Sequence, residues 1–409
     1  MEKKNRLLEK MAVFFCCCLI AVNMVNTVKA EEIKEPEESS FYSKACAMTD
    51  GDSNRLLYGK NETQKLSNAS TTKILTCILA MENCSMDEVV TFSAKAAAQP
   101  KVHLGTKEGE QFYMRDLLYG LMLESYNDCA YAIAEHVGGS VEKFAEMMNE
   151  KAGEIGCTDS HFVTPNGLDD KDSGGTHHTT AYDLCKIMGY CAWKSPQSKQ
   201  FLTLTQTRSH SFNSLSGTGY AVSNKNAFLD MMDHVITGKT GFTAKAGYCY
   251  VAALEEGGRR YAIALLACGW PNHKTYRWED AKDLFSYGMD SFHLYRGTEE
   301  SLKTEPVSIA GGMREQTLKE WSTHASLPLS IDGKVKELTF LKADWENGEM
   351  KKTMELPYHL PIKKGQKLGT ISYCIEGREI YSCSICAGED VKKWDFLSFV
   401  KVLWEEFLL

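Results

Sequence analysis

The sequence predicts an α+β fold followed by a small all-β domain, and three features of its pattern support that prediction. Apolar residues recur at helical spacing in several segments between residues 71 and 191. Between 235 and 268 they alternate or run continuously, as they do in the strands of a sheet. Between 302 and 387, short apolar runs alternate with turn pairs such as Gly311-Gly312 and Asp332-Gly333. A helical region therefore interrupts one antiparallel sheet, and a smaller β unit follows it.

The first domain is expected over residues 46–298. It begins with strand-like pieces in 46–60, where Gly51 and Gly59 are turn signals, and the apolar spacing after Thr71 predicts a helix over 71–83. Further helices are expected over 114–137 with a break near Ser125, and over 141–153, 180–191 and 280–292. Strands are expected over 235–241, 247–254 and 259–268, with a polar loop over 160–180. The second domain, a small β-sandwich-like unit, is expected over 299–390.

Both ends of the chain are predicted to lie outside these domains. Residues 1–30 combine a basic start, an apolar run and small residues near Ala30, which predicts a cleaved signal peptide and an exported protein, with an uncleaved anchor helix as the alternative. Residues 31–45 are polar and acidic and are expected to form a linker. Residues 391–409 are mostly apolar with a narrow polar stripe, which favours an amphipathic helix lying on a membrane surface. A helix docked on the β domain is the alternative.

Composition limits the possible functions. Hydrophobic residues make up 43% of the 409-residue chain and charged residues 24%, which is typical of globular proteins. The formal net charge of -8 argues against a nucleic-acid partner, which would require a basic surface. Twelve of the 15 cysteines lie outside the leader, most of them within helix-like or strand-like apolar segments. We therefore expect mostly free, packed thiols, even for Cys383 and Cys386, whose spacing resembles a redox or zinc motif.

Three short motifs carry the chemistry. In Ser70-Thr71-Thr72-Lys73, a helix would place Ser70 and Lys73 on one face, where the amine can act as base for the hydroxyl. Ser125-Tyr126-Asn127 falls at a helix break, where a hydroxyl and an amide can relay protons and hold a carbonyl. Lys239-Thr240-Gly241 follows the apolar Val235-Ile236 and so lies on a strand. The first motif is weak alone, but the three together, in this order, are the set found in penicillin-binding proteins and class A β-lactamases.

The chain resembles the serine D-alanyl-D-alanine carboxypeptidases, which are low-molecular-mass penicillin-binding proteins, over nearly its whole mature length. Besides the three motifs, Thr164–Leu168, His177–Ala181 and Pro361–Gln366 are similar to blocks of that family. The resemblance implies a β-lactamase/transpeptidase-like catalytic domain with an antiparallel sheet and a helical subdomain. The sequence departs from the family at Tyr126, where glycine is usual, and this departure affects the expected shape of the pocket.

The resemblance also implies a reaction and its residues. Ser70 would attack the bond between the two D-alanines of a peptidoglycan stem pentapeptide, with Lys73 as general base and Ser125 as proton shuttle. The implied substrate-binding groups are Asn127, Lys239, Thr240, Gly241, the backbone N–H of Phe242 in the oxyanion hole, and Arg277. A surface ion pair is an equal alternative for Arg277. β-Lactams would acylate Ser70, and the enzyme would act at the outer face of the cytoplasmic membrane or in the cell wall.

Other functions remain open from the sequence. A β-lactamase would need a deacylating base, typically in an E-x-x-L-N loop, and no such loop follows the second motif. An endopeptidase or transpeptidase could use the same site, and a non-catalytic peptidoglycan-binding protein could retain the fold. Glu124 is a further candidate base or a helix-end charge. His177 and His178 lack the context of a metal motif and are expected to support a loop, so we expect no metal and no cofactor.

Overall fold

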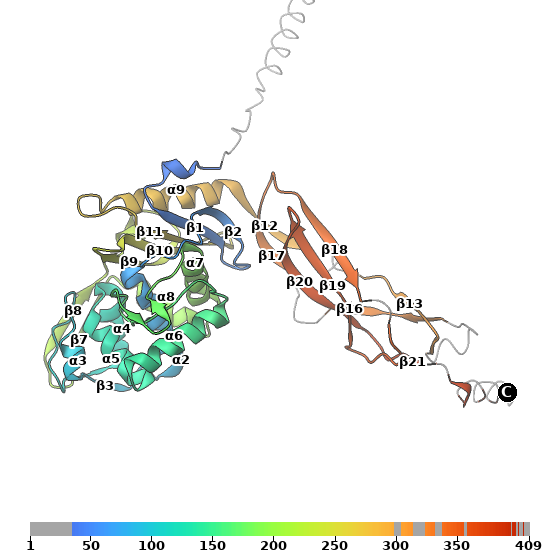
Figure 1. The fold of residues 1–409 in the computed structure, drawn as a ribbon, viewed down its shortest axis with the longest axis horizontal. Helices are drawn as coiled ribbons and strands as arrows, with labels where there is room; N and C mark the ends of the chain where they lie inside the picture. Colours follow the sequence, from blue (N-terminus) through green and yellow to red (C-terminus); the bar gives the residue numbers. More distant parts are fainter. Residues whose placement is uncertain are drawn as a thin grey trace, which may run out of the picture. The chain divides into compact units, whose positions relative to one another are not determined.

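The fold is described from a computed structural model of the chain (Figure 1). The structure describes residues 35–297, 304–313, 324–331, 338–355, 358–393, 395–397, 400 and 404. The predicted signal peptide, residues 1–30, and most of the predicted C-terminal helix lie outside the described residues.

A five-stranded antiparallel sheet forms the centre of the first domain. Its order is β2-β1-β11-β10-β9, and the strands are β1 (Ala45–Asp50), β2 (Leu56–Lys60), β9 (Val235–Thr243), β10 (Gly247–Glu256) and β11 (Arg259–Leu266). The predicted hairpin joins β10 to β11, and Gly257 and Gly258 both adopt positive φ there. The early and late strands of the sequence therefore meet in one sheet, as expected for an inserted helical region.

Both faces of this sheet are buried. Successive side chains of a strand point to opposite faces, so neighbouring residues of one strand contribute to two different cores. In β10, Val251 and Ala253 join the core formed with the helical region, whereas Tyr250 and Leu254 join a second core. The second core includes Leu284 and its neighbours on α9 (Tyr276–Ser291), the helix that covers this face in Figure 1.

The inserted region is mainly helical. Its longer elements are α2 (Lys73–Asn83), α4 (Met114–Tyr119), the π-helical turn η3 (Gly120–Glu124), α5 (Asn127–Gly138), α6 (Val141–Ile155), α7 (Ala181–Gly189), the π-helical turn η4 (Tyr190–Lys194) and α8 (Ser198–Gln206). The short elements are the 3-10 turn η2 (Ala69–Thr72), α3 (Ala94–Ala97), the 3-10 turn η5 (Ala227–Asp230), and the paired strands β3 (Val89–Thr91), β4 (Gln111–Tyr113), β5 (Lys171–Asp172), β6 (Gly175–Thr176), β7 (Ser209–Asn213) and β8 (Gly219–Ser223). The predicted break near Ser125 is present between η3 and α5. Helix α2 is buried along nearly all of its length, so it serves as the central helix of this region.

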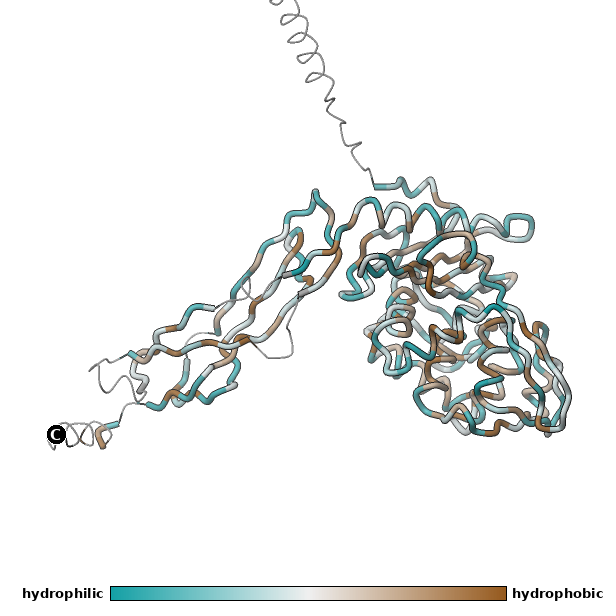
Figure 2. The backbone as a smooth tube through the Cα atoms, turned by 180° about the vertical axis from the view of Figure 1, so that it is seen from behind, coloured by the Kyte–Doolittle hydropathy of each residue, from teal (hydrophilic) through white to brown (hydrophobic). Residues whose placement is uncertain are grey.

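The described residues between 292 and 393 form strands and connecting turns, as predicted for a small all-β domain. This part of the chain contains β12 (Phe292–Gly297), β13 (Val307–Ala310), β14 (Gly312–Met313), β15 (His324–Leu327), β16 (Leu329–Ile331), β17 (Leu338–Ala343), β18 (Gly348–Met354), β19 (Lys367–Ile375), β20 (Arg378–Ala387) and β21 (Lys392–Lys393). All its pairings are antiparallel, and hydrophobic and hydrophilic residues alternate along the strands in Figure 2. Small cores such as that of Ile309, Leu327 and Ile362 hold these strands together.

The structure bears on the chain ends and on the thiols. Strand β21 pairs with β14, so the predicted terminal helix starts later than residue 391. Phe396, Leu397, Val400 and Trp404, which follow β21, are exposed. No described helix is both long enough and apolar enough to cross a membrane. Ten of the twelve cysteines outside the leader are buried, so most of these thiols are packed within the fold; that they are unpaired stays a prediction.

Candidate active site

Ser70 lies at the entrance of the central helix. It belongs to η2, which runs directly into α2, and Lys73 Nζ donates a hydrogen bond to Ser70 Oγ at 2.8 Å. The residue before it, Ala69, has a φ of 49°, a backbone conformation that is costly for a residue with a side chain. Gly167 has a φ of 80°, and a Cβ at that position would overlap the carbonyl oxygen of Ala69. The turn that presents Ser70 therefore depends on a close backbone approach that only glycine permits.

Lys73 is fully buried and held by uncharged partners. Its Nζ donates to Asn127 Oδ1 at 2.9 Å and to the backbone carbonyl of Asn166 at 2.8 Å, in addition to Ser70. Burial and, after it, the nearby charge of Lys239 hold the pKa of Lys73 well below its usual range. A lysine with a lowered pKa loses its proton more readily than an ordinary lysine, and the free amine can accept the proton of the serine hydroxyl.

Ser125 and Lys239 form a second pair. Ser125 has a φ of 69°, and this left-handed conformation ends η3 and starts the turn into α5. Lys239, on strand β9, is buried and donates to Ser125 Oγ at 2.9 Å and to the carbonyl of Thr240 at 2.9 Å. Burial and the charge of Arg277 lower the pKa of Lys239 to about 7. Strand β9 is an edge strand of the sheet, so this pair borders the helical region.

A cavity of about 330 Å³ brings most of the predicted site residues together. Seven of the nine predicted residues line it, namely Ser70, Ser125, Asn127, Thr240, Gly241, Phe242 and Arg277. The other two, Lys73 and Lys239, are buried and connect to it through their hydrogen bonds to Ser70 and Ser125. A Cβ on Gly241 would lie 3.0 Å from the backbone nitrogen of Ser70, so this glycine lets β9 pass close to Ser70.

Arg277 lies in the first turn of α9 and faces this cavity. Its guanidinium lies over the ring of Tyr248, 4.8 Å from the centroid, and over the ring of Trp278 at 4.5 Å. Within the described residues it forms no ion pair, and its Nε has no hydrogen-bond partner. The surface ion pair that the sequence allowed is therefore not the arrangement found.

Tyr126, within the second motif, and Glu124, directly before it, both have structural partners. The ring of Tyr126 packs on the core beside Gly120, where a Cβ would lie 3.1 Å from the ring, and Tyr126 is not among the residues that line the cavity. Glu124 lines the cavity but pairs with Lys225 at 3.1 Å and accepts from the backbone N–H of Ser223 at 3.0 Å. Tyr126, which stands where the family usually has glycine, thus leaves the cavity open. Glu124 is a helix-end charge that is paired with Lys225.

The sequence did not assign roles to two residues that support the site. The backbone carbonyl of Asn166 accepts a hydrogen bond from Lys73 Nζ, and the Asn166 side chain donates one to Gln99 Oε1 at 3.1 Å. Asp128 accepts from the backbone N–H groups of Leu104 at 2.9 Å and Gly105 at 3.0 Å, which positions a loop that borders the cavity. The block around Asn166 stood out in the sequence only by its resemblance to a family block, because a backbone carbonyl leaves no residue-type signal.

His177 supports the loop, as expected. Its Nε2 lies 2.9 Å from Thr72 Oγ1, and its Nδ1 accepts from the backbone N–H of Val163 at 3.1 Å. Burial lowers the pKa of His177 to about 4, so the ring is neutral at physiological pH. Both ring nitrogens are engaged by the protein, and the ring ties the loop to the helix that carries Ser70.

The fold and the site together define a class of protein. A serine and a buried lysine at the start of a central helix, a second serine at a helix break, and a lysine on an edge strand surround one cavity. This arrangement on an antiparallel sheet is that of the serine acyl-transfer enzymes with penicillin-binding folds.

Comparison with known proteins gives the family. Residues 30–268 match the D-alanyl-D-alanine carboxypeptidase family, and residues 326–393 match the C-terminal domain of penicillin-binding protein 5. The chain therefore belongs to the serine D-alanyl-D-alanine carboxypeptidases, which are hydrolases, and the fold class and enzyme class predicted from the sequence are confirmed.

Several relatives are similar along most of their length. The D-alanyl-D-alanine carboxypeptidase DacF of Bacillus subtilis is 28% identical over 375 residues, which are 90% of each chain. DacB2 of Mycobacterium tuberculosis is 34% identical over 59% of this chain and 80% of its own. The crystal structure of penicillin-binding protein 5 from Haemophilus influenzae has a TM-score of 0.68, covers 88% of this chain and 99% of its own, and at 22% identity shows the fold.

Proposed function

We propose that this carboxypeptidase removes the terminal D-alanine of peptidoglycan stem pentapeptides with Ser70 as nucleophile and Lys73 as general base. The observation that carries the proposal is the 2.8 Å contact between Lys73 Nζ and Ser70 Oγ, formed by an amine that is fully buried and has a lowered pKa. No described carboxylate forms an ion pair with this amine, and burial outweighs the attraction of Asp128, which acts to raise its pKa.

The acylation step follows from this geometry. Lys73 accepts the hydroxyl proton while Ser70 Oγ bonds to the penultimate D-alanine carbonyl. The oxyanion is held by backbone N–H groups of Ser70 and Phe242, each such donor being worth about 3–4 kcal/mol in comparable sites. Collapse of the intermediate breaks the peptide bond; Ser125 gives its proton to the leaving D-alanine amine and regains one from Lys73, which thereby returns to its free-amine form. Water then attacks the ester carbonyl, which releases the shortened peptide and restores the Ser70 hydroxyl.

The terminal carboxylate of the substrate needs a cationic, hydrogen-bonding site. Thr240 and Arg277 line the cavity, and Lys239 lies directly behind Thr240, whose carbonyl it contacts at 2.9 Å. The Arg277 guanidinium is fixed by Tyr248 and Trp278 and has no carboxylate partner among the described residues. We assign these three residues to carboxylate binding, and Asn127 to the acyl carbonyl and to Lys73.

β-Lactams present a similar carboxylate and a reactive carbonyl, so they are expected to acylate Ser70 in place of the peptide. Rapid release of that adduct would require a carboxylate that activates water. Glu124 is the one carboxylate among the described residues that line the cavity, and it pairs with Lys225. We therefore expect slow deacylation, which favours the carboxypeptidase over the β-lactamase alternative.

Purified protein tests the assignment directly. Ser70→Ala is expected to abolish both covalent labelling by fluorescent penicillin and D-alanine release from a defined stem pentapeptide, while Ser67→Ala, a control three residues away, retains both. Labelling that survives Ser70→Ala would overturn the nucleophile. Rapid turnover of the penicilloyl adduct would identify a β-lactamase, and cleavage of cross-linked muropeptide dimers in preference to the pentapeptide would identify an endopeptidase. Absence of both activities in the parent protein would favour a non-catalytic peptidoglycan-binding role.

Export and surface association form a separate part of the proposal. The basic and apolar leader supports export, and the exposed Phe396, Leu397 and Trp404 after β21 support shallow insertion at a membrane surface. Truncation after Lys393 is expected to release the exported protein from membranes and leave D-alanine release intact. Retention on membranes after truncation would count against this anchor.

A further inference from the structure

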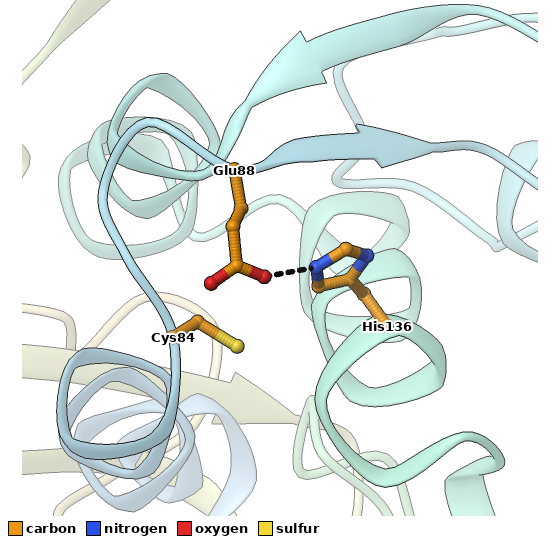
Figure 3. Close-up of side chains that lie close together, drawn as sticks. All are labelled: Cys84, Glu88 and His136. Carbon is orange, nitrogen blue, oxygen red and sulfur yellow. Dashed lines mark hydrogen bonds and ion pairs between the residues drawn. The ribbon is translucent and has the colours of Figure 1, made fainter.

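Three side chains with metal-ligating atoms converge outside the active site (Figure 3). Cys84 caps the C-terminal end of α2, Glu88 directly precedes β3, and His136 lies in the last turn of α5. One ligand atom from each residue lies within 4.8 Å of the other two. In Figure 3 the thiol, the carboxylate and the imidazole point toward one another, although they come from three different elements.

The loop that supplies two of these groups is held in place by backbone hydrogen bonds. The backbone N–H of Ser85 donates to Glu88 Oε1 at 2.6 Å, which leaves Oε2 facing His136 Nε2 at 2.9 Å. The carbonyl of Glu88 accepts from the N–H of Met114 at 2.9 Å. The chain therefore fixes the carboxylate through one oxygen and presents the other toward the imidazole and the thiol.

The electrostatic setting favours a cation. Helices α2 and α5 both end at this cluster, and the C-terminal end of a helix carries a partial negative charge of roughly half an elementary unit. Glu88 adds a full negative charge. Arg115 of α4, whose backbone N–H donates to the Met86 carbonyl of this loop, has its guanidinium paired with Asp87. His136 keeps about a quarter of its side chain exposed, at 27%, so an ion can enter from solvent.

We propose that Cys84, Glu88 and His136 form a binding site for Zn²⁺. Thiolate sulfur, imidazole nitrogen and carboxylate oxygen together are a ligand set that zinc prefers over magnesium or calcium. Tetrahedral zinc, with bonds of about 2.0–2.3 Å, places its ligand atoms roughly 3.3–3.8 Å apart. The cluster reaches that geometry by side-chain movements of about an ångström or less, and water fills the fourth position.

Binding exchanges protons for the metal. Burial and the adjacent Glu88 raise the pKa of Cys84 to about 11, so the metal-free residue is a thiol. The S–H bond breaks as the Zn–S bond forms, and that proton passes to solvent. The proton that His136 Nε2 shares with Glu88 Oε2 passes to solvent, and the ring binds the metal through Nε2 as the neutral imidazole with a proton on Nδ1. Glu88 Oε2 exchanges its contact with His136 for a bond to the metal.

The position of this site suggests what the metal does. The first residues of the same two helices, Lys73 of α2 and Asn127 of α5, are joined at 2.9 Å in the active site. Zinc at the opposite ends, about 15 Å away along each helix, would cross-link α2 and α5 a second time. The inferred role is therefore structural, a clamp on the helix pair that carries the base and its amide partner.

The test uses the mature full-length protein, freed of metal and titrated with ZnCl₂ alone. We expect one tight site by calorimetry, an upward shift of Tm with zinc, and a thiolate-to-metal charge-transfer band when Co²⁺ replaces Zn²⁺. Cys84→Ser should remove that band, and both Cys84→Ser and His136→Gln should weaken zinc binding by roughly tenfold or more.

Two matched controls separate this site from adventitious binding. Cys386→Ser removes another partly exposed thiol, and His210→Gln breaks a pair with Asp116 in which the histidine has the same 27% side-chain exposure as His136. Both controls should bind zinc as the parent does. The proposal is overturned if the parent binds no zinc, if Co²⁺ gives no thiolate band, or if the Cys84 and His136 variants keep the parent's affinity and Tm shift. The result is independent of D-alanine release, so it does not depend on the proposed function.

Discussion

Replacing Gly167 by alanine tests whether the close packing beneath the nucleophile sets the activity. Gly167 has a φ of 80°, and a Cβ there would overlap the Ala69 carbonyl and lie 2.8 Å from Thr72 Oγ1. Ala69 already holds positive φ, and Ser70 follows it directly, so the added methyl can be accommodated only by moving the backbone that presents the nucleophile.

The expected size of the effect has two parts. Positive φ costs a residue with a side chain about 1–2 kcal/mol, and overpacking a well-packed site adds about 1–3 kcal/mol. Gly167→Ala should therefore lower the free energy of unfolding by roughly 2–5 kcal/mol. Activity should fall further than stability alone explains, because a misplacement of about 1 Å can cost roughly 100-fold in rate.

The assay is the second-order rate of acylation by fluorescent penicillin at a temperature where the variant is folded, together with Tm. Gly153→Ala is the matched control, because no atom lies within 4 Å of the position of its Cβ. Gly153 is within helix α6, so alanine should stabilise this position by up to about 1 kcal/mol and leave acylation unchanged. If Gly167→Ala acylated at the parent rate with an unchanged Tm, the reasoning about this contact would be refuted.

Two predictions concern pH. Because burial and Lys239 lower the pKa of Lys73, the pH profile of kcat/KM should rise with an apparent pKa well below the usual lysine value of about 10.4. A rise at the usual lysine value would contradict Lys73 as the base. The folded protein holds the pKa of His177 at about 4, below the usual value of about 6.5. Between these two pH values the unfolded chain therefore binds more protons than the folded chain. The free energy of unfolding should fall by up to about 3 kcal/mol as the pH drops from 6.5 to 4. Denaturant unfolding across this range should show the slope, and His177→Gln should flatten it.

Several parts of the site could be predicted because they depend on residue type and local spacing. Ser70 and Lys73 lie three residues apart at a helix start, and the sequence alone indicates both the helix and the pair. Lys239 follows a strand-like apolar run, so its place on a sheet strand was also predictable. The burial of most cysteines was predictable from their positions within apolar segments.

Other parts could not be predicted because they depend on backbone atoms or on distant segments. The carbonyl of Asn166 accepts from Lys73, and any residue type has such a carbonyl. Strand β12 lies within the range predicted for the first domain yet pairs with β17, more than 40 residues along the chain, and only long-range pairing could reveal this. The domain limits predicted from the sequence accordingly remain predictions.

Residue types and their local spacing were enough to predict the chemistry proposed for this protein, because nucleophile, base and carboxylate-binding groups each require particular residue types in recognisable local patterns. The tertiary structure decided which of these groups act together and in what protonation state. The pKa values of Lys73 and Lys239 are lowered only because folding buries both amines and places Lys239 near Lys73 and Arg277 near Lys239. Tyr126 leaves the cavity open only because its ring packs beside Gly120. Likewise, Glu88 and His136, 48 residues apart, become neighbours only when α2 and α5 pack together. Burial and long-range contact are properties of the folded chain, and a local pattern in the sequence does not encode them.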